Sequence, residues 1–290
     1  LRVDKGAEPF ASGDFSASYT GSDTTGAQTT GSGRVALIGR VNVTPGAPGG
    51  FSVFLCGGTG LGASVRNGEL DWVDGQIVSE VHHGGSLLAN ANLTAKYQHL
   101  GTRDFSGTGS ITTVRPYDVT TFAGFNLKLG TGANITGKVT AFKLDELSAN
   151  IPLELHKGGV KVVEATLNGL YKHETRNFTG EGRATVVKQI TIAQNVGSKH
   201  YSFYLEPTSG VSANVANNAL TQVTGRLVVL VADGASPDQG FLKATAQGTY
   251  RGGDAPSVDA NGGLEVIRDK EMLTSSTGYV VWLKRGSGAT

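Results

Sequence analysis

The feature that most constrains the fold is an internal repeat with a period of about 75 residues. Four tyrosines mark it at near-equal spacing, namely Tyr19, Tyr97, Tyr171 and Tyr250. Six apolar columns also stay in register when the chain is shifted by 74 residues and then by a further 76. These columns begin at Phe51, Leu55, Val65, Leu70, Ile77 and Val81. The spacing predicts three full copies of one folding unit.

A fourth copy starts but does not finish. Tyr250, Gly263 and Leu283 keep its early columns, and the chain ends at Thr290 before the later ones. We therefore expect an N-terminal segment over residues 1–14, a first pair of repeats over 15–166, and a second pair over 167–290 with its last copy truncated.

The pattern inside each copy is that of antiparallel β-structure. Polar and apolar residues alternate in Phe125–Leu129 and Ile151–Leu155, as in strands with one buried face. Pairs such as Asn67-Gly68 and Asp74-Gly75 are expected to form turns, because glycine and asparagine accept a positive φ. The chain has 43 glycines in 290 residues, which suits many short turns.

These signals predict an all-β fold, and two arrangements of the copies compete. In the first, the copies form antiparallel β-sandwich or barrel units, packed in pairs. In the second, the copies share strands in one continuous array. We favour sandwich or barrel units, because the apolar columns hold enough large residues for each copy to have its own core.

Composition excludes several classes of function. Lys and Arg total 25 against 24 Asp and Glu, and no basic run occurs, so nucleic acid is not an expected partner. No stretch approaches the roughly 18 apolar residues of a membrane helix, and the strands alternate too irregularly for lipid-facing ones, so membrane insertion is not expected. The single cysteine, Cys56, excludes an intrachain disulfide and is expected to be an inert thiol.

The histidines do not indicate a metal site, although two histidine columns repeat. His82 and His156 are 74 residues apart, and so are His99 and His173. Equivalent positions on different copies lie apart in space, so we expect these imidazoles not to converge and no zinc to be bound. We predict no metal, no cofactor and no catalytic residues.

Three Gly-x-Gly triplets look like phosphate-binding loops but lack the rest of that motif. They are Gly31-Ser32-Gly33, Gly107-Thr108-Gly109 and Gly180-Glu181-Gly182. None has a following Lys-Ser or Lys-Thr, and none leads from a strand into a helix pattern. We expect them to be bulges or turns that open a strand.

Trp72 is the candidate ligand contact under a second interpretation. It lies between Asp71 and Asp74, and Asp145-Glu146 occurs at nearly the same position in the next copy. Paired acids beside an aromatic platform are what a glycoside-active enzyme needs, but the sequence offers few aromatic residues outside the repeat columns. An enzyme is therefore less favoured than a carbohydrate- or cell-surface-binding module.

A nearly neutral, glycine-rich repeat protein without reactive groups is typical of a structural or assembly protein. The leading hypothesis is a building block of an extracellular, cell-surface or virion assembly, such as a filament, sheath, tail or capsid-associated protein. The chain begins at Leu1 and not at Met, which implies processing or trimming, and a removed signal or leader peptide is one ordinary cause. Self-association is the expected interaction, with a glycan as the candidate ligand under the alternative.

The incomplete fourth copy predicts where subunits meet. A sheet edge without its partner strand invites pairing with another chain. The candidate contacts lie in the N-terminal segment and the last strand, namely Leu1, Val3, Phe10, Val280, Trp282 and Leu283. The alternative is that residues 1–13 close the fourth copy within the same chain.

Overall fold

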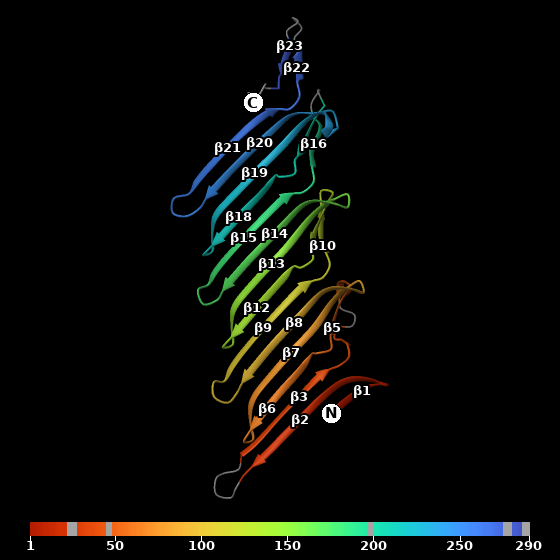
Figure 1. Ribbon diagram of the computed structural model, residues 1–290, viewed down its shortest axis with the longest axis vertical. Coiled ribbons are helices and arrows are strands. Elements are labelled where there is room, and N and C mark those ends of the chain that lie inside the picture. The colour runs from red at the N-terminus through yellow and green to blue at the C-terminus, as the bar shows by residue number, and fades with distance from the viewer. Residues whose placement is uncertain (22–27, 45–47, 197–199, 275–279, 286–290) are drawn as a thin grey trace. The chain divides into compact units, whose positions relative to one another are not determined.

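A computed structural model shows that the chain folds almost entirely into antiparallel β-structure, as predicted (Figure 1). The structure describes residues 1–21, 28–44, 48–196, 200–274 and 280–285. Strands β1 to β21 form the antiparallel ladders of the sheet structure, while β22 (Lys270–Thr274) and β23 (Val280–Leu283) form a separate hairpin. Within those described ranges, helical structure is limited to two short 3-10 turns, η1 (Pro48–Gly50) and η2 (Pro237–Gln239).

The chain divides into two compact units. The first comprises Leu1–Tyr117, Leu129–Ile151 and Gly169–Asn177. The second comprises Asp118–Lys128, Pro152–Asn168 and Phe178–Thr290. The predicted boundary between residues 166 and 167 falls inside a strand, and the division into two pairs of repeats stays a prediction.

In the first unit, long strands form a ladder and short strands extend it at one end. The ladder runs in the order β1 (Arg2–Lys5), β2 (Glu8–Thr20), β3 (Gln28–Leu37), β6 (Gly60–Arg66), β7 (Glu69–His83), β8 (Ser86–Gln98), β9 (Asp104–Thr113), β12 (Asn134–Thr140) and the first part of β13 (Lys143–Lys157). The short strands β4 (Val41–Asn42) and β5 (Phe51–Leu55) pair with each other, and β5 pairs with β7.

The second unit repeats this plan. Its ladder joins β15 (Asn177–Val186), β18 (Gly210–Ala216), β19 (Ala219–Asp233), β20 (Gly240–Arg251) and β21 (Ser257–Val266). Its other strands are β10 (Tyr117–Phe122), β11 (Phe125–Leu129), β14 (Val160–Lys172), β16 (Ile190–Val196) and β17 (Tyr201–Leu205). β16 pairs with β17, which pairs with β19 as β5 does with β7.

Strands of 5, 7 and 15 residues follow one another three times, as β5 to β7, β11 to β13 and β17 to β19. Val65, Val139 and Val215, which share one predicted column, each lie at a register shift in the second strand of the three. The strand lengths agree with the spacing of the columns. The repeat itself remains a prediction from the sequence.

Two expectations about packing are wrong. In place of sandwich or barrel units, each with its own core, strands such as β9 and β12 pair directly in one sheet. Several column residues also do not point into a core, since Val65 is 41%, Leu144 40% and Leu220 44% exposed, although Val231 is buried. Alternation creates an apolar face on each strand, but it does not supply a second layer to cover that face.

The small core lies where the short strands join the long ones. In the second unit, Tyr204 of β17 packs with Leu230 and Ala232 of β19, and Ile267 packs against them. The Tyr204 hydroxyl donates to the carbonyl of Ala235 at 2.6 Å. Burial is therefore concentrated at one end of the long strands.

The 15-residue strands β7 and β19 change partner partway along their length. β7 pairs with β6 as far as Gln76 and with β5 from Ser79 onward. The N–H of Val78 faces the gap between those two partners, while its C=O accepts from the backbone N–H of Cys56 at 2.8 Å. The hydroxyl of Thr59 fills that gap, because its oxygen accepts from the Val78 N–H at 2.9 Å and donates to the Val78 carbonyl at 2.9 Å. One side chain thus replaces a missing backbone partner.

The same arrangement recurs in the second unit. The Ser209 hydroxyl accepts from the Val228 N–H at 2.9 Å and donates to its carbonyl at 3.2 Å. Ser209 and Val228 stand 150 residues after Thr59 and Val78. Both are almost fully buried, so water cannot take the place of this hydroxyl.

The glycine-containing motifs divide into those that form turns and those that do not. Asn67 and Gly68 have φ values of 52° and 82° and connect β6 to β7, as predicted. Asp74-Gly75 is not a turn, because both residues lie inside β7. The three Gly-x-Gly triplets are also not turns or strand openings, since they lie within β3, β9 and β15.

The N-terminal segment does not close the fourth copy. β1 and the start of β2 form a hairpin, and the amino group of Leu1 donates to the carbonyl of Gly13 at 2.6 Å. β2 then pairs with β3. Residues 1–13 therefore bond to their own end of the first unit.

Candidate functional site

The most distinctive surface of the first unit is the apolar face of its sheet. Residues directly opposite each other on paired strands project to the same side, so the register defines the two faces. In the ladder from β2 to the first part of β13, the large apolar side chains that are more than one-third exposed lie on one side only. They are Phe15, Tyr19, Val35, Leu61, Val65, Ile77, Leu93, Ile111, Ile135, Leu144 and Leu147, and we call this surface the apolar face.

The apolar face carries no charged side chain. In β8, for example, its positions are Ala89, Ala91, Leu93, Ala95 and Tyr97. The charged residues of these strands project to the opposite side, which we call the polar face. The sheet of the first unit is therefore sharply two-sided.

Glycines on the apolar face lie beneath large side chains of the neighbouring strand. A Cβ added at Gly33 would lie 2.3 Å from Cδ1 of Phe15, and one at Gly75 would lie 2.6 Å from Cδ2 of Leu61. Gly109 is covered in the same way by Leu93 at 3.3 Å. These large side chains lie flat along the sheet, so the apolar face is low and even. This packing accounts for Gly33 and Gly109, the last glycines of two of the mid-strand Gly-x-Gly triplets.

The second unit has an equivalent apolar face. Its exposed large side chains are Leu167, Phe178, Val211, Leu220, Leu227, Val258 and Leu264. A groove of about 490 Å³ runs between Val211, Leu227 and neighbouring small residues such as Gly225 and Ala246. Val258 and Leu264 of β21 are 71% and 74% exposed, more than the other members of this set.

The polar face is covered by cross-strand hydrogen bonds and ion pairs. Ser16 and Ser32 hydroxyls lie 3.0 Å apart, and those of Thr94 and Thr108 lie 2.8 Å apart. Arg34 pairs with Asp74 at 2.9 Å. Exposed pairs of this kind add little stability, but they keep this face well hydrated.

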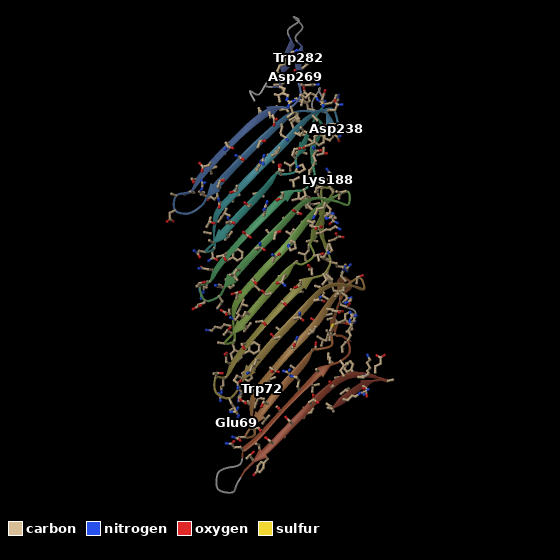
Figure 2. The ribbon with its side chains drawn as sticks, viewed as in Figure 1. Glu69, Trp72, Lys188, Asp238, Asp269 and Trp282 are labelled. Carbon is tan, nitrogen blue, oxygen red and sulfur yellow. The ribbon has the colours of Figure 1, made fainter. Side chains whose placement is uncertain are left out.

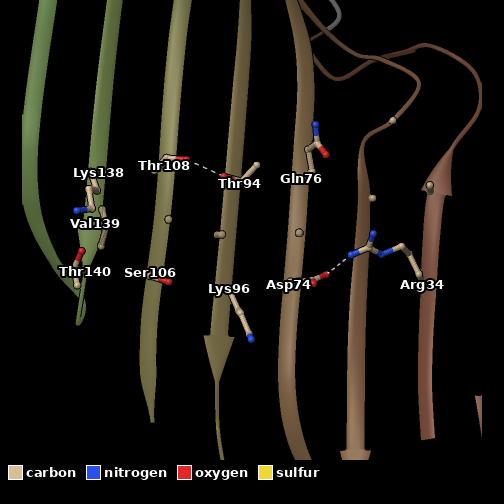
Figure 3. Close-up of a pocket in the computed structure, with 16 residues that line it drawn as sticks. Arg34, Asp74, Gln76, Thr94, Lys96, Ser106, Thr108, Lys138, Val139 and Thr140 are labelled. Carbon is tan, nitrogen blue, oxygen red and sulfur yellow. Dashed lines mark hydrogen bonds and ion pairs between the residues drawn. The ribbon is translucent and has the colours of Figure 1, made fainter. Parts of the chain in front are cut away.

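A groove of about 590 Å³ lies on the polar face of the first unit (Figure 3). Arg34, Asp74, Lys96 and Thr108 contribute to its lining. Within the described part of the chain Lys96 has no ion-pair partner, so the groove offers one unneutralised cation beside several hydroxyls. Trp72, the sequence candidate for a ligand contact, does not line it.

Trp72 lies on β7 and is only partly exposed (Figure 2). A Cβ at Gly62 would lie 3.3 Å from its ring, so the indole packs over the neighbouring strand. Asp71, next to it, is buried and accepts bonds from Arg66 at 2.8 Å and Gln98 at 2.9 Å. These contacts hold the start of β7 in place, and they engage both carboxylate oxygens of Asp71.

Two of the four repeated histidines, His82 and His156, each bind a carboxylate on their own strand. His82 Nε2 donates to Glu80 at 2.9 Å, and His156 Nε2 donates to Glu154 at 2.8 Å. These hydrogen bonds are the main reason that the pKa values of Glu80 and Glu154 are lowered. Arg40 also lies 2.5 Å from His82 Nε2, but that nitrogen already donates to Glu80, so Arg40 is held by its 2.8 Å ion pair with Glu80.

No metal site is evident in the part of the chain that the structure describes. The described residues contain no cluster of three or more His, Cys, Asp or Glu side chains suited to a metal ion. The pKa of the Cys56 thiol is raised by burial and by nearby Glu80, which keeps it protonated and weakly nucleophilic. The prediction that no zinc is bound remains to be tested.

The predicted subunit contacts are mostly accessible. Leu1 is 71% and Val3 43% exposed, and Phe10 is partly buried. In the separate hairpin, Trp282 is 49% exposed, and the ammonium group of Lys284 lies 5.5 Å from its ring. Leu283 is partly buried, and Val280 pairs with Thr274. Sequence reasoning placed the contacts at the chain ends and missed the apolar face, which the register of the ladder reveals.

Comparison with known proteins gives no relative on which to base a function, since no family model, curated protein or solved structure matches the chain. Among the described residues no helix is long and apolar enough to cross a membrane. The function must therefore be argued from the surfaces themselves.

Proposed function

We propose that this chain is a non-enzymatic structural protein that self-associates, as a building block of an extracellular or virion assembly. The observation that carries the proposal is the extended, charge-free apolar face on the sheet of each unit. Apolar patches larger than a few hundred Å² are uncommon on monomeric proteins and mark interaction surfaces.

The energy available from this face supports association. Full burial of a large aliphatic or aromatic side chain contributes about 1.5–3 kcal/mol, so a half-exposed one has about 1 kcal/mol left to gain. The eleven such residues of the first unit then offer on the order of 10 kcal/mol. This is comparable to the roughly 4–15 kcal/mol that association costs. Because the gain and the cost are of similar size, stable association needs a large, continuous contact, as in a structural assembly.

The polar face fits the same role. Its hydroxyl pairs and ion pairs leave charges of both signs in water, which keeps an assembled layer hydrated on its outer side. The carbohydrate-binding alternative depends on Trp72, and the packing of that ring over Gly62 argues for a structural role.

Sedimentation velocity over a wide concentration range, with electron microscopy of the same samples, tests the proposal. We expect large species or regular particles that dissociate on dilution. A protein that stays monomeric at every concentration would contradict the proposal. If that monomer also bound immobilised glycans, and a Trp72→Ala variant lost the binding, the alternative function would be supported.

A further inference from the structure

We propose that the apolar face of the first unit packs against the same face of a second copy of this chain. The two sheets then stack with their apolar faces inward and their polar faces outward. This inference rests on the proposed function and adds to it the contact surface and the partner.

The distribution of charge favours this partner. Two apolar faces can meet without burying an ionised group, because none of their strand positions is charged. Contact through the polar face would bury the cations Arg34, Lys96 and Lys138, together with the carboxylates that pair with Arg34 and Lys138. Buried ion pairs seldom recover their cost of desolvation.

The shape of the face favours a second sheet. Because Phe15, Leu61 and Leu93 lie over the glycines of neighbouring strands, the surface is even and lacks tall ridges. Stacked sheets pack face to face at about 10 Å, and a flat surface that is rich in glycine and alanine allows such an approach. The same surface on both partners gives a two-fold symmetric contact.

The apolar face of the first unit is large enough to form a protein–protein interface. A standard interface takes roughly 20–30 residues from each partner. The rows of apolar-face positions from β2 to β12 supply that many in the first unit alone. On a face of this size, the small contributions of many half-exposed side chains can add up and hold two copies together.

A lipid surface is less well matched. Binding to membranes usually needs cations at the rim that contact anionic headgroups. Here Arg34 and Lys138 are paired with Asp74 and Asp145 on the opposite face. The net charge of the whole chain is +1, so no general attraction to anionic lipid is expected.

Two adjacent residues of β8 give a matched test. Leu93 lies on the apolar face and is 45% exposed, while Thr94 lies on the polar face. Leu93→Lys and Thr94→Lys introduce the same charge at neighbouring positions of one strand. We expect Leu93→Lys to weaken self-association about tenfold or more, and Thr94→Lys to change it by less than about twofold. Circular dichroism checks that both variants keep their β-structure.

A milder pair, Leu93→Ala and Thr94→Ala, covers the case in which the lysine variant fails to fold. If wild-type protein assembles and both leucine variants assemble equally well, the face-to-face contact is wrong while the proposed function stands. If the wild type does not assemble, both fail. Flotation with uncharged and anionic phosphatidylcholine-based vesicles completes the test, because a monomer that floats with vesicles would assign the face to lipid instead.

Discussion

The points at which β7 and β19 change pairing partner differ from the corresponding position in β13. They differ in how the backbone N–H at that point is satisfied. In β7 and β19 the residue at the change of partner has an N–H that needs an acceptor, and a hydroxyl from Thr59 or Ser209 supplies it. In β13 the residue 74 positions after Val78 is Pro152, which has no N–H. The residue 74 positions after Thr59 is Ala133, which has no hydroxyl.

The difference shows that donor and acceptor change together. A buried N–H without a partner costs about 1–3 kcal/mol, whereas removing both members of a pair can be nearly neutral. Residue 133 lacks the hydroxyl and residue 152 lacks the N–H, so the absence of this hydroxyl leaves no N–H of residue 152 without an acceptor. Each variant below tests whether this comparison has the energetic meaning that we assign to it.

The largest effect is expected for Ser209→Ala. This change leaves the buried N–H of Val228 without an acceptor and should lower the free energy of unfolding by about 1–3 kcal/mol. Urea denaturation monitored by circular dichroism measures it. Thr224→Ala is the control, since that hydroxyl has an exposed partner 3.5 Å away and its loss should have little effect.

A double variant tests the coupling directly. Ser209→Ala with Val228→Pro reproduces the residues found at positions 133 and 152. We expect the combined loss of stability to be smaller than the sum of the single losses by about 1 kcal/mol, because proline removes the N–H that alanine leaves unpaired. Strictly additive losses would show that the Ser209 hydroxyl and the Val228 N–H are not energetically coupled.

A smaller loss is expected for Thr59→Ala in the first unit. Thr59 and Val78 are only partly buried, so water can replace the hydroxyl after substitution. The expected cost is about 0.5–1.5 kcal/mol, and Thr59→Ser should restore most of it. Equal losses for Thr59→Ala and Ser209→Ala would mean that burial does not set the size of the effect.

A stabilising change is expected at the turn that precedes Ser209. Thr208 has a φ of 83°, whereas the equivalent Gly58 and Gly132 have φ values of 92° and 80°. A β-branched residue is strained in this region, and glycine is not. Thr208→Gly should therefore raise the free energy of unfolding by about 0.5–1 kcal/mol, after allowing for the entropy that glycine loses on folding. A loss of stability would show that the threonine side chain makes a contact worth more than the strain.

The sequence predicted local structure better than packing. Phe125–Leu129 forms β11, and Asn67-Gly68 forms a turn, because both signals act over a few residues. Gly33 and Gly75 misled the prediction, since glycine is needed there by a side chain on the adjacent strand and not by a turn. The same limit applies to the faces, because alternation cannot tell whether another layer covers the apolar side.

The candidate surface was harder to predict than the fold. Leu93 belongs to β8, and its place beside Ile77 and Gly109 depends on the register of three strands. That register is set by pairings between distant segments, which a single sequence does not give. The prediction of contacts at the chain ends depended on a partial fourth copy, whereas the apolar face extends over many strands in each unit.

The smallest effect is expected for the two Glu–His pairs. One pair lies in each unit, so they allow a second comparison of the two units. Hydrogen bonds from His82 and His156 lower the pKa values of Glu80 and Glu154, whose ordinary value is 4.5. A carboxyl group with a lowered pKa in the folded state stabilises the protein above its unfolded pKa, and that contribution is lost as the pH falls through the folded pKa. Glu80→Gln and Glu154→Gln should therefore each lower the melting temperature near neutral pH, by about 1 °C. Well below pH 4.5 the variants should melt with the wild type. Glu164→Gln is the control, because Glu164 is more exposed and pairs only with Lys161 in the described chain. A difference between wild type and Glu80→Gln that persists in acid would show that the glutamate acts through packing and not through its charge.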